Sequence, residues 1–333
     1  MSRSALAVAG FLVALGALVW VLTRDRDAPL APMEAPARVA PAAAAPEASA
    51  PVQAPPARAP AATATGALPR VSTRDELSQV LRARGLDAEK LIAGYRDWRL
   101  ARGFLGADPL AGITTENAPS QVYAAMDRST QKALADSGDL GAIQAYAAGS
   151  LPGDPFTAVK YYGHASELGS AAAMAQVANV LADLGDLQPG ATQNDRPFAD
   201  KLLALRGGNP DRDLRQDAVA WTLASIRQYG PIVATPSNME LVEDLAPNPD
   251  KAVAMAICGQ SLAILASLSA ATAGKDTATL PPVFITEKNL YDRLPCRDTP
   301  APVSPPRALE ACTSSPAIGS NDQPVELWIC PEN

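Results

Sequence analysis

The feature that most limits what this chain can fold into is an uncharged apolar run near its start, residues 4–22, SALAVAGFLVALGALVWVL. A helix of that length, rising by about 1.5 Å per residue, covers roughly the 30 Å hydrocarbon thickness of a bilayer. Arg3 precedes the run, TRDRD follows it, and Trp20 lies where an aromatic ring suits the lipid–water boundary. We expect an uncleaved transmembrane helix within an anchor of residues 1–27. The alternative is a cleaved signal peptide, which usually has a shorter apolar core.

The orientation of this anchor depends on the cysteines more than on the flanking charges. Only the N-terminal amine and Arg3 precede the run, whereas Arg24 and Arg26 follow it, so the Lys/Arg count weakly favours a cytoplasmic domain. All four cysteines lie beyond the anchor, however, and disulfides persist in oxidising compartments. We therefore predict a single-pass protein of the inner (cytoplasmic) membrane, with its C-terminal domain in the periplasm or outside the cell.

Residues 28–70 form a segment of mostly Ala and Pro without hydrophobic periodicity. Recurrent proline prevents helix propagation, and the small side chains offer too little apolar surface to offset ordering of the chain. We predict a disordered, semi-extended linker that reaches at most about 130 Å in polyproline II form. A proline-rich ligand motif is the weaker alternative.

The composition of the remaining chain favours an all-α fold. Alanine dominates the apolar residues and aromatic residues make up only 5%, which suits closely packed helices better than a sheet with β-branched and aromatic faces. The formal net charge is −7 and the basic residues are dispersed, so nucleic acid is not an expected partner. We divide the rest into a helical domain, residues 71–279, and a Pro-rich, cysteine-containing extension, residues 280–333.

Capping and spacing signals predict the individual helices. Thr73 and Glu76 have capping-box spacing before a helix that ends near Gly85, and Asp87 can cap a second helix that ends near Gly103. This first pair is either a hairpin packed on the later helices or a small separate unit. The further helices are expected near residues 121–136, 140–148, 155–168, 170–185, 215–230 and 250–266.

One helix in residues 139–230 carries a pattern of small and aromatic residues. Ala158, Tyr161, Ala165 and Gly169 fall at offsets 0, 3, 7 and 11 in PGDPFTAVKYYGHASELGSAAA. Small residues let a neighbouring helix approach, and glycine permits a left-handed turn after the helix. A second, degraded copy ends in RQDAVAWTLASIRQYG, where Ala218 and Trp221 match Ala158 and Tyr161.

This pattern resembles the SEL-one-like repeat, a member of the tetratricopeptide-like helical hairpin class. The resemblance covers residues 139–230, with one good and one degraded unit, and the second unit holds an insertion, LQPGATQNDRPFADKLLALRGGNPDRDL. It implies an α-solenoid-like fold that acts as a scaffold or adaptor for envelope or membrane proteins. From the residues themselves, Tyr161, Tyr162 and Trp221 are expected to pack in the core.

Three of the four cysteines lie in the C-terminal extension, at Cys296, Cys312 and Cys330, and Cys258 lies in the last predicted helix. No CxxC pair occurs and the chain has one histidine, so we predict no metal site. Two disulfides allow three pairings. We predict Cys258–Cys296, which would fix the extension to that helix, and Cys312–Cys330, which would close a terminal loop.

No catalytic or cofactor site is predicted. The single histidine, His164, lies within a repeat helix without a nucleophile motif nearby, and no phosphate-binding glycine loop occurs. Paired carboxylates that cleave a glycan are the enzymatic alternative, with Glu89, Glu116 and Glu167 as available residues. A factor that associates with peptidoglycan without cleaving it is the third hypothesis.

Overall fold

The computed structural model describes residues 67–187, 196–245, 250–271 and 279–331. The predicted anchor, residues 4–22, and all but the end of the predicted linker lie outside these ranges. The helices are α2 (Arg74–Ala83), α3 (Ala88–Ala101), α4 (Pro119–Ala124), α5 (Arg128–Asp136), α6 (Leu140–Ala148), α7 (Pro155–Glu167), α8 (Ala171–Gly185), α9 (Arg196–Leu205), α10 (Leu214–Tyr229), α11 (Pro236–Leu245) and α12 (Lys251–Ala271). The strands are β1 (Val283–Glu287), β2 (Thr313–Ile318) and β3 (Pro324–Ile329).

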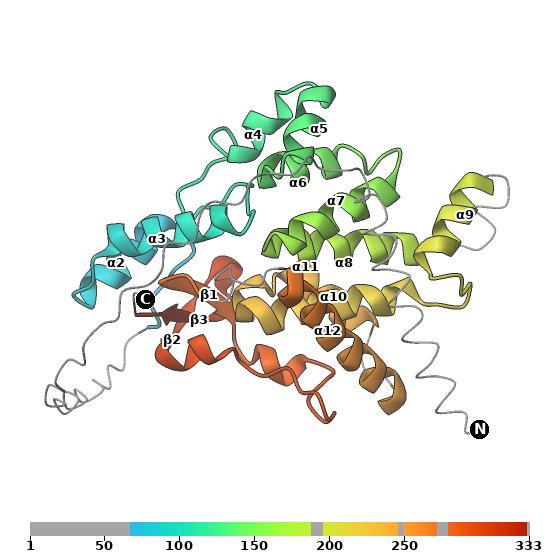
Figure 1. The fold of residues 1–333 in the computed structure, drawn as a ribbon. Helices are drawn as coiled ribbons and strands as arrows, with labels where there is room; N and C mark the ends of the chain where they lie inside the picture. The colour runs from blue at the N-terminus through green and yellow to red at the C-terminus, as the bar shows by residue number, and fades with distance from the viewer. Residues whose placement is uncertain (1–66, 188–195, 246–249, 272–278, 332–333) are drawn as a thin grey trace, which may run out of the picture.

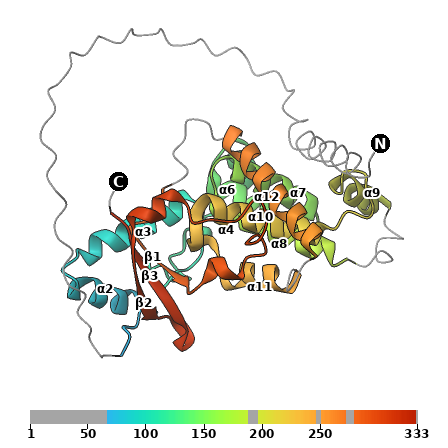
Figure 2. The same ribbon diagram turned by 90° about the horizontal axis from the view of Figure 1, so that it is seen from below.

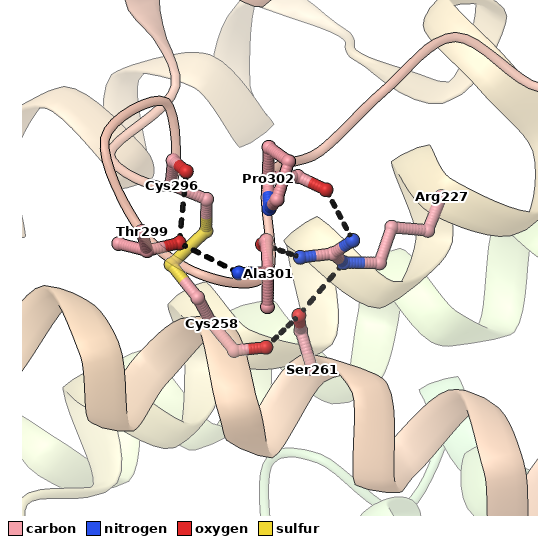
Figure 3. The surroundings of a disulfide bond; sticks show 7 residues. All are labelled: Arg227, Cys258, Ser261, Cys296, Thr299, Ala301 and Pro302. Carbon is pink, nitrogen blue, oxygen red and sulfur yellow. Dashed lines mark hydrogen bonds between the residues drawn. A yellow bond between two sulfur atoms is a disulfide. The ribbon is translucent and has the colours of Figure 1, made fainter.

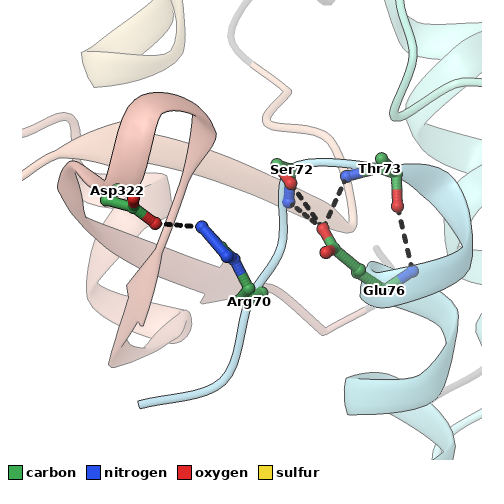
Figure 4. A network of polar contacts seen from close by, with 5 residues as sticks. All are labelled: Arg70, Ser72, Thr73, Glu76 and Asp322. Atoms are coloured by element: carbon green, nitrogen blue, oxygen red, sulfur yellow. Dashed lines mark hydrogen bonds and ion pairs between the residues drawn. The ribbon is translucent and has the colours of Figure 1, made fainter. Parts of the chain in front are cut away.

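The prediction of a mostly helical fold is confirmed, and several helices begin where their caps were expected. Thr73 accepts from the backbone of Glu76, whose side chain reaches back to the cap and completes the capping box (Figure 4). Asp87 caps α3, and Ser170 caps α8 by accepting from the backbone N–H of Ala173. Since each cap satisfies donors that the first helical turn leaves free, the local sequence fixes these starts.

One predicted helix is wrong in detail, and one helix was not predicted. The single helix expected over residues 121–136 is two helices, because Asp127 accepts from the backbone of Ser129 and Thr130 and begins α5 anew. The insertion of the second repeat-like unit contains α9, which projects at the end of the molecule opposite the sheet (Figures 1 and 2).

The all-α prediction is also wrong, because the C-terminal extension contains a three-stranded sheet. The strand order is β1-β3-β2, and both pairings are antiparallel. Phe284 of β1 stacks on Trp328 of β3 with ring centroids 6.1 Å apart, and the indole of Trp328 donates to Thr286. Cross-strand contacts between residues far apart in the chain therefore order a segment that its proline content had marked as irregular.

Buried apolar residues form two clusters. The first, which we call the helical core, lies mostly among α5 to α12, includes Met174 and Tyr229, and takes in Leu290 and Leu294 of the extension. The second, the sheet core, joins residues of α2 and α3 to residues of the three strands, among them Leu81 and Phe284. Gly94 of α3 allows close contact there, since a Cβ at that position would lie 2.8 Å from the side chain of Pro282. The first helical pair thus shares its core with the end of the chain.

The chain enters the described region along the edge of this sheet. The backbone N–H of Val71 donates to Ile318 at 2.9 Å, and that of Ile318 donates to Pro69 at 2.8 Å, beside an ion pair between Arg70 and Asp322 (Figure 4). The start of the described residues is therefore bonded to β2, close to their end.

A disulfide and one arginine hold the loop after Cys296 to the helices (Figure 3). Cys258 of α12 is bonded to Cys296 with a Cα–Cα distance of 5.7 Å. Arg227 of α10 donates to the carbonyls of Ala301 and Pro302, at 2.5 and 2.7 Å, and to the hydroxyl of Ser261 at 3.0 Å. These contacts place the loop after Cys296 against the pair α10 and α12.

Among the described residues, α12 alone has the length and apolar composition that a bilayer span requires. Its most apolar stretch is 33% buried, and the helix packs on α10. This finding concerns a different segment from the predicted anchor.

Candidate functional site

A cleft opens among the helices of the helical core. It is lined by residues from six parts of the chain, and the space between them is about 20 Å³, which is room for about one water molecule. Its apolar walls come from α7, α8, the end of α9 and α10, and its polar groups come from α10, the loop before it and α12. The lining residues are Val159, Gly163, Val177, Leu181, Leu205, Arg212, Asp217, Trp221 and Gln260. We call this site the Arg212 cleft.

The polar part of the Arg212 cleft is an ion pair with an amide beside it. Nε of Arg212 lies 2.8 Å from one carboxylate oxygen of Asp217, and Nη2 donates to the other oxygen at 3.1 Å. The side-chain amide of Gln260 donates to that second oxygen at 2.5 Å. The side chains of Arg212 and Asp217 are 18% and 8% exposed, so solvent screens this pair little.

One donor of this group is not used. Nε and Nη2 of Arg212 contact the carboxylate of Asp217, whereas Nη1 is buried without a hydrogen-bond partner. Buried donors in proteins nearly always have a partner, so an unpaired one beside a cleft calls for an explanation. Because Nη1 is shielded from solvent, the surface of the cleft consists of apolar walls beside the paired groups of Arg212, Asp217 and Gln260.

Burial and pairing act in opposite directions on Asp217. Desolvation raises the pKa of this carboxyl and is the largest effect, while Arg212 and Gln260 stabilise its charged form. The net direction is upward. Forming the ion pair therefore costs desolvation free energy, as is usual for buried charges.

Local sequence explains how the helices form this site. Asp217 and Trp221 are one turn apart on α10 and therefore share a face. On α7 and α8, Val159 with Gly163 and Val177 with Leu181 repeat the same spacing. Because α10 packs against α8 and α12, and α7 against α8, these faces meet.

The repeat-signature residues lie mostly in the interior. Ala158, Ala165 and Ala218 are fully buried, and Trp221 is 6% exposed and lines the Arg212 cleft. Tyr161 is half-buried; its ring packs edge-on against Tyr146 at 4.7 Å.

Two further contacts involve this signature. The hydroxyl of Tyr161 donates to Asp136 at 2.8 Å. Gly169 follows α7 in the left-handed conformation, with φ of +94°, and its carbonyl accepts from Tyr229 at 2.9 Å.

The four cysteines form the two pairs that we predicted. Cys258–Cys296 joins α12 to the extension, and Cys312–Cys330 joins the residue before β2 to the residue after β3. Since Thr313 pairs with Ile329 in the sheet, the second disulfide continues an existing strand pairing. These cysteines bring elements together and do not line the Arg212 cleft.

The residues named for the enzymatic alternative lie on separate elements. Glu89 of α3 pairs with Arg74 and Arg82. Glu116 is exposed in the loop before α4. On α7, a carboxylate oxygen of Glu167 lies 3.5 Å from Nδ1 of His164. Over the described ranges, no three His, Cys, Asp or Glu side chains gather as they would around a metal ion.

Sequence reasoning missed Arg212, Asp217 and Gln260. The first two stand in a charged stretch, NPDRDLRQDAVAW, that is typical of an exposed helix start. The usable signal was that Asp217 shares a helical face with Trp221, whereas a solvated acidic residue is expected on the opposite face.

Comparisons with known proteins add no relative. No protein-family model matches the chain, and neither the search of curated proteins nor that of solved structures finds a match.

Proposed function

We propose that this protein is a membrane-anchored scaffold or adaptor whose exported helical array binds another envelope or membrane protein. The observation that carries the proposal is the stacked array of helices, on which the apolar Arg212 cleft marks a place where a partner side chain can begin to pack. The repeat-like spacing from Ala158 to Gly169 supports the same class of function.

The stacked arrangement also suits a binding role. α6, α7, α8 and α10 pack in chain order, α6 on α7, α7 on α8 and α8 on α10. Arrays of this kind form extended surfaces on which partner segments can lie. Since fold alone does not determine function, the test must address the cleft itself.

Site-specific photocrosslinking in native membranes tests this proposal. We would place a photoreactive amino acid at Leu205, which is half-buried at the cleft, or at Val122 of α4, which is 61% exposed and lies outside it. We expect one defined membrane or envelope protein, identified by mass spectrometry, to crosslink at residue 205 and not at residue 122.

Filling the cleft supplies the matched control. The additional substitution Leu181→Phe should remove the crosslink at residue 205 without changing the amount of protein in the membrane. Absence of any crosslink at residue 205 would contradict the proposal. Sedimentation of the full chain with purified peptidoglycan, without a protein partner, would instead favour the peptidoglycan-associated function.

A further inference from the structure

We infer that α9 is a hinged cover of the helical stack, which opens from α7 as a local unit and uncovers the apolar walls of the Arg212 cleft. The opening itself is a property of the fold and needs no partner. Its role rests on the proposed function, because the surface that α9 uncovers becomes available to the partner protein.

α9 is attached to the stack much less extensively than its neighbours. Leu202 is its one buried residue, whereas α8 buries eight of its 15 residues. In the described part of the chain, α8 packs along both α7 and α10, and α9 makes only sparse contact with any one helix (Figures 1 and 2). Segments with few buried apolar contacts open locally, at a lower free energy than global unfolding requires.

The contacts that join α9 to α7 lie at the start of α7. Phe198 packs edge-on against Phe156, with ring centroids 5.0 Å apart. Nζ of Lys201 lies 3.3 Å from a carboxylate oxygen of Asp154, and the two side chains are 54% and 39% exposed. Because solvent screens an ion pair of this kind, it adds little stability. Phe198 therefore contributes more than Lys201 to the closed position.

Two glycines follow α9 and can serve as its hinge. Gly207 and Gly208 have φ of +66° and +78°, a conformation that other residues rarely adopt. Their backbone N–H groups donate to carbonyls of Ala204 and Leu203, so these bonds end α9 and move with it. A Cβ at Gly208 would meet no atom within 4 Å, which leaves this part of the backbone free to change its dihedral angles.

Opening of α9 would remove one wall of the Arg212 cleft. Leu205, at the end of α9, lines the cleft together with Val159 and Trp221, which are 7% and 6% exposed. With α9 closed, the space between these walls holds about one water molecule. Displacement of Leu205 would turn apolar side chains of α7, α8 and α10 toward solvent, which favours either reclosure or contact with an apolar surface of the partner.

Thiol labelling of the full chain in lipid nanodiscs measures the opening. The chain has four cysteines and all are paired, so an introduced cysteine supplies the one free thiol. Val159→Cys places it on the cleft wall, and Val219→Cys places it at a fully buried position of α10 that does not line the cleft. We expect a maleimide to label residue 159 about ten-fold or more faster than residue 219, which larger unfolding must expose.

One variant and a matched control assign this labelling to α9. Phe198→Ala should accelerate labelling of residue 159 by about ten-fold, because it removes the aromatic contact and its buried area, and should leave residue 219 unchanged. Leu203→Ala truncates a side chain of the same helix that is 41% exposed, so it should change neither rate. Circular dichroism verifies each fold, and Phe198→Leu, which loses the ring but stays apolar, replaces Phe198→Ala if that variant does not fold.

The inference is overturned if residue 159 is labelled no faster than residue 219, or if Phe198→Ala and Leu203→Ala have equal effects. Photocrosslinking at residue 205 should increase in the Phe198→Ala chain, and an unchanged yield would remove the role of α9 as a cover. A partner crosslinked at residue 205 without faster labelling of residue 159 would remove this inference and leave the proposed function in place. Opening of α9 without any crosslinked partner would do the reverse.

Discussion

The stacked helices α6 to α10 and the described part of the C-terminal extension, residues 280–331, are ordered in different ways. The helices pack through alanine, with Ala158, Ala165, Ala173, Ala178, Ala218 and Ala224 all fully buried. The extension contains short strands and loops, and it is joined to itself and to α12 by two disulfides. Close packing of small residues orders the first region, whereas covalent links and long-range strand pairing order the second.

This difference predicts that the two regions respond to different changes. The helical stack should tolerate loss of the disulfides but not added volume, because its helices approach closely. The extension should depend on its covalent links, since small disulfide-bonded segments bury too little apolar surface to be stable alone. Two experiments address this contrast and a third concerns charge within the helical array; they follow from the largest expected effect to the smallest.

Removing the disulfide between α12 and the extension should have the largest effect. Cys258 and Cys296 are 38 residues apart. Removing a disulfide that closes a loop of that size lowers the free energy of unfolding by about 4 kcal/mol. We expect this loss in Cys258→Ser with Cys296→Ser, measured by urea unfolding. Hydrogen exchange should rise in α12 and in residues 290–303.

The second disulfide provides the control. Cys312 and Cys330 are 18 residues apart, so Cys312→Ser with Cys330→Ser should cost about 3 kcal/mol and increase exchange mainly in the sheet. If either pair of substitutions increases exchange in α6 to α8 as much as in the extension, the contrast between the two regions is wrong.

Adding volume to the helical stack should have an intermediate effect. Ala165 of α7 is fully buried, so Ala165→Leu should lower the free energy of unfolding by about 1–3 kcal/mol through overpacking. Ala148→Leu makes the same change at an exposed position of α6 and should alter it by about 0.5 kcal/mol or less. Equal losses in the two variants would show that the stack is not closely packed at α7.

The smallest expected effect is the change of folding stability with pH. This change has opposite signs for two carboxyls of the helical array. Lys132 and Tyr161 donate to Asp136 and lower its pKa, so its contribution to stability is present above its ordinary pKa and is lost as the pH falls through the lowered value. Burial raises the pKa of Asp217, so its contribution is present below the ordinary pKa and is lost as the pH rises through the raised value.

Replacement by asparagine separates these two signs. Asp136→Asn should weaken the loss of stability on acidification from pH 6 to about pH 3, a range that contains the ordinary carboxyl pKa. Asp217→Asn should weaken the opposite trend, in which stability falls as the pH rises above that ordinary value. Thermal unfolding across this range measures both, and the same sign for the two variants would contradict the assignment.

The sequence predicted the helices better than the sheet, and the reason is physical. Helix starts depend on residues within one turn, such as Thr73, Asp87 and Ser170, and these signals are visible in the chain. Strand β1 pairs with β3, so that Val283 meets Ile329 from the far end of the extension. Such pairing has no local signal, and Pro316 and Pro324 within the strands argued against them.

The Arg212 cleft could not be predicted from the sequence for a related reason. Its walls come from four helices and its polar group from a loop and two helices, so no single stretch of sequence contains it. Trp221 was found through the repeat spacing and was expected to pack in the core. That it also lines a cleft depends on where α7, α9 and α12 lie relative to it.

The bonding of residues 69–71 to β2 has a mechanical consequence. Tension applied to the chain ahead of Pro69 first meets the two backbone hydrogen bonds with Ile318 and the ion pair of Arg70 with Asp322. From β2 the load passes through the strand pairing and the Cys312–Cys330 bond into β3. The helices that form the Arg212 cleft lie outside this short path, so a pull on the start of the folded region strains the sheet before it strains the cleft.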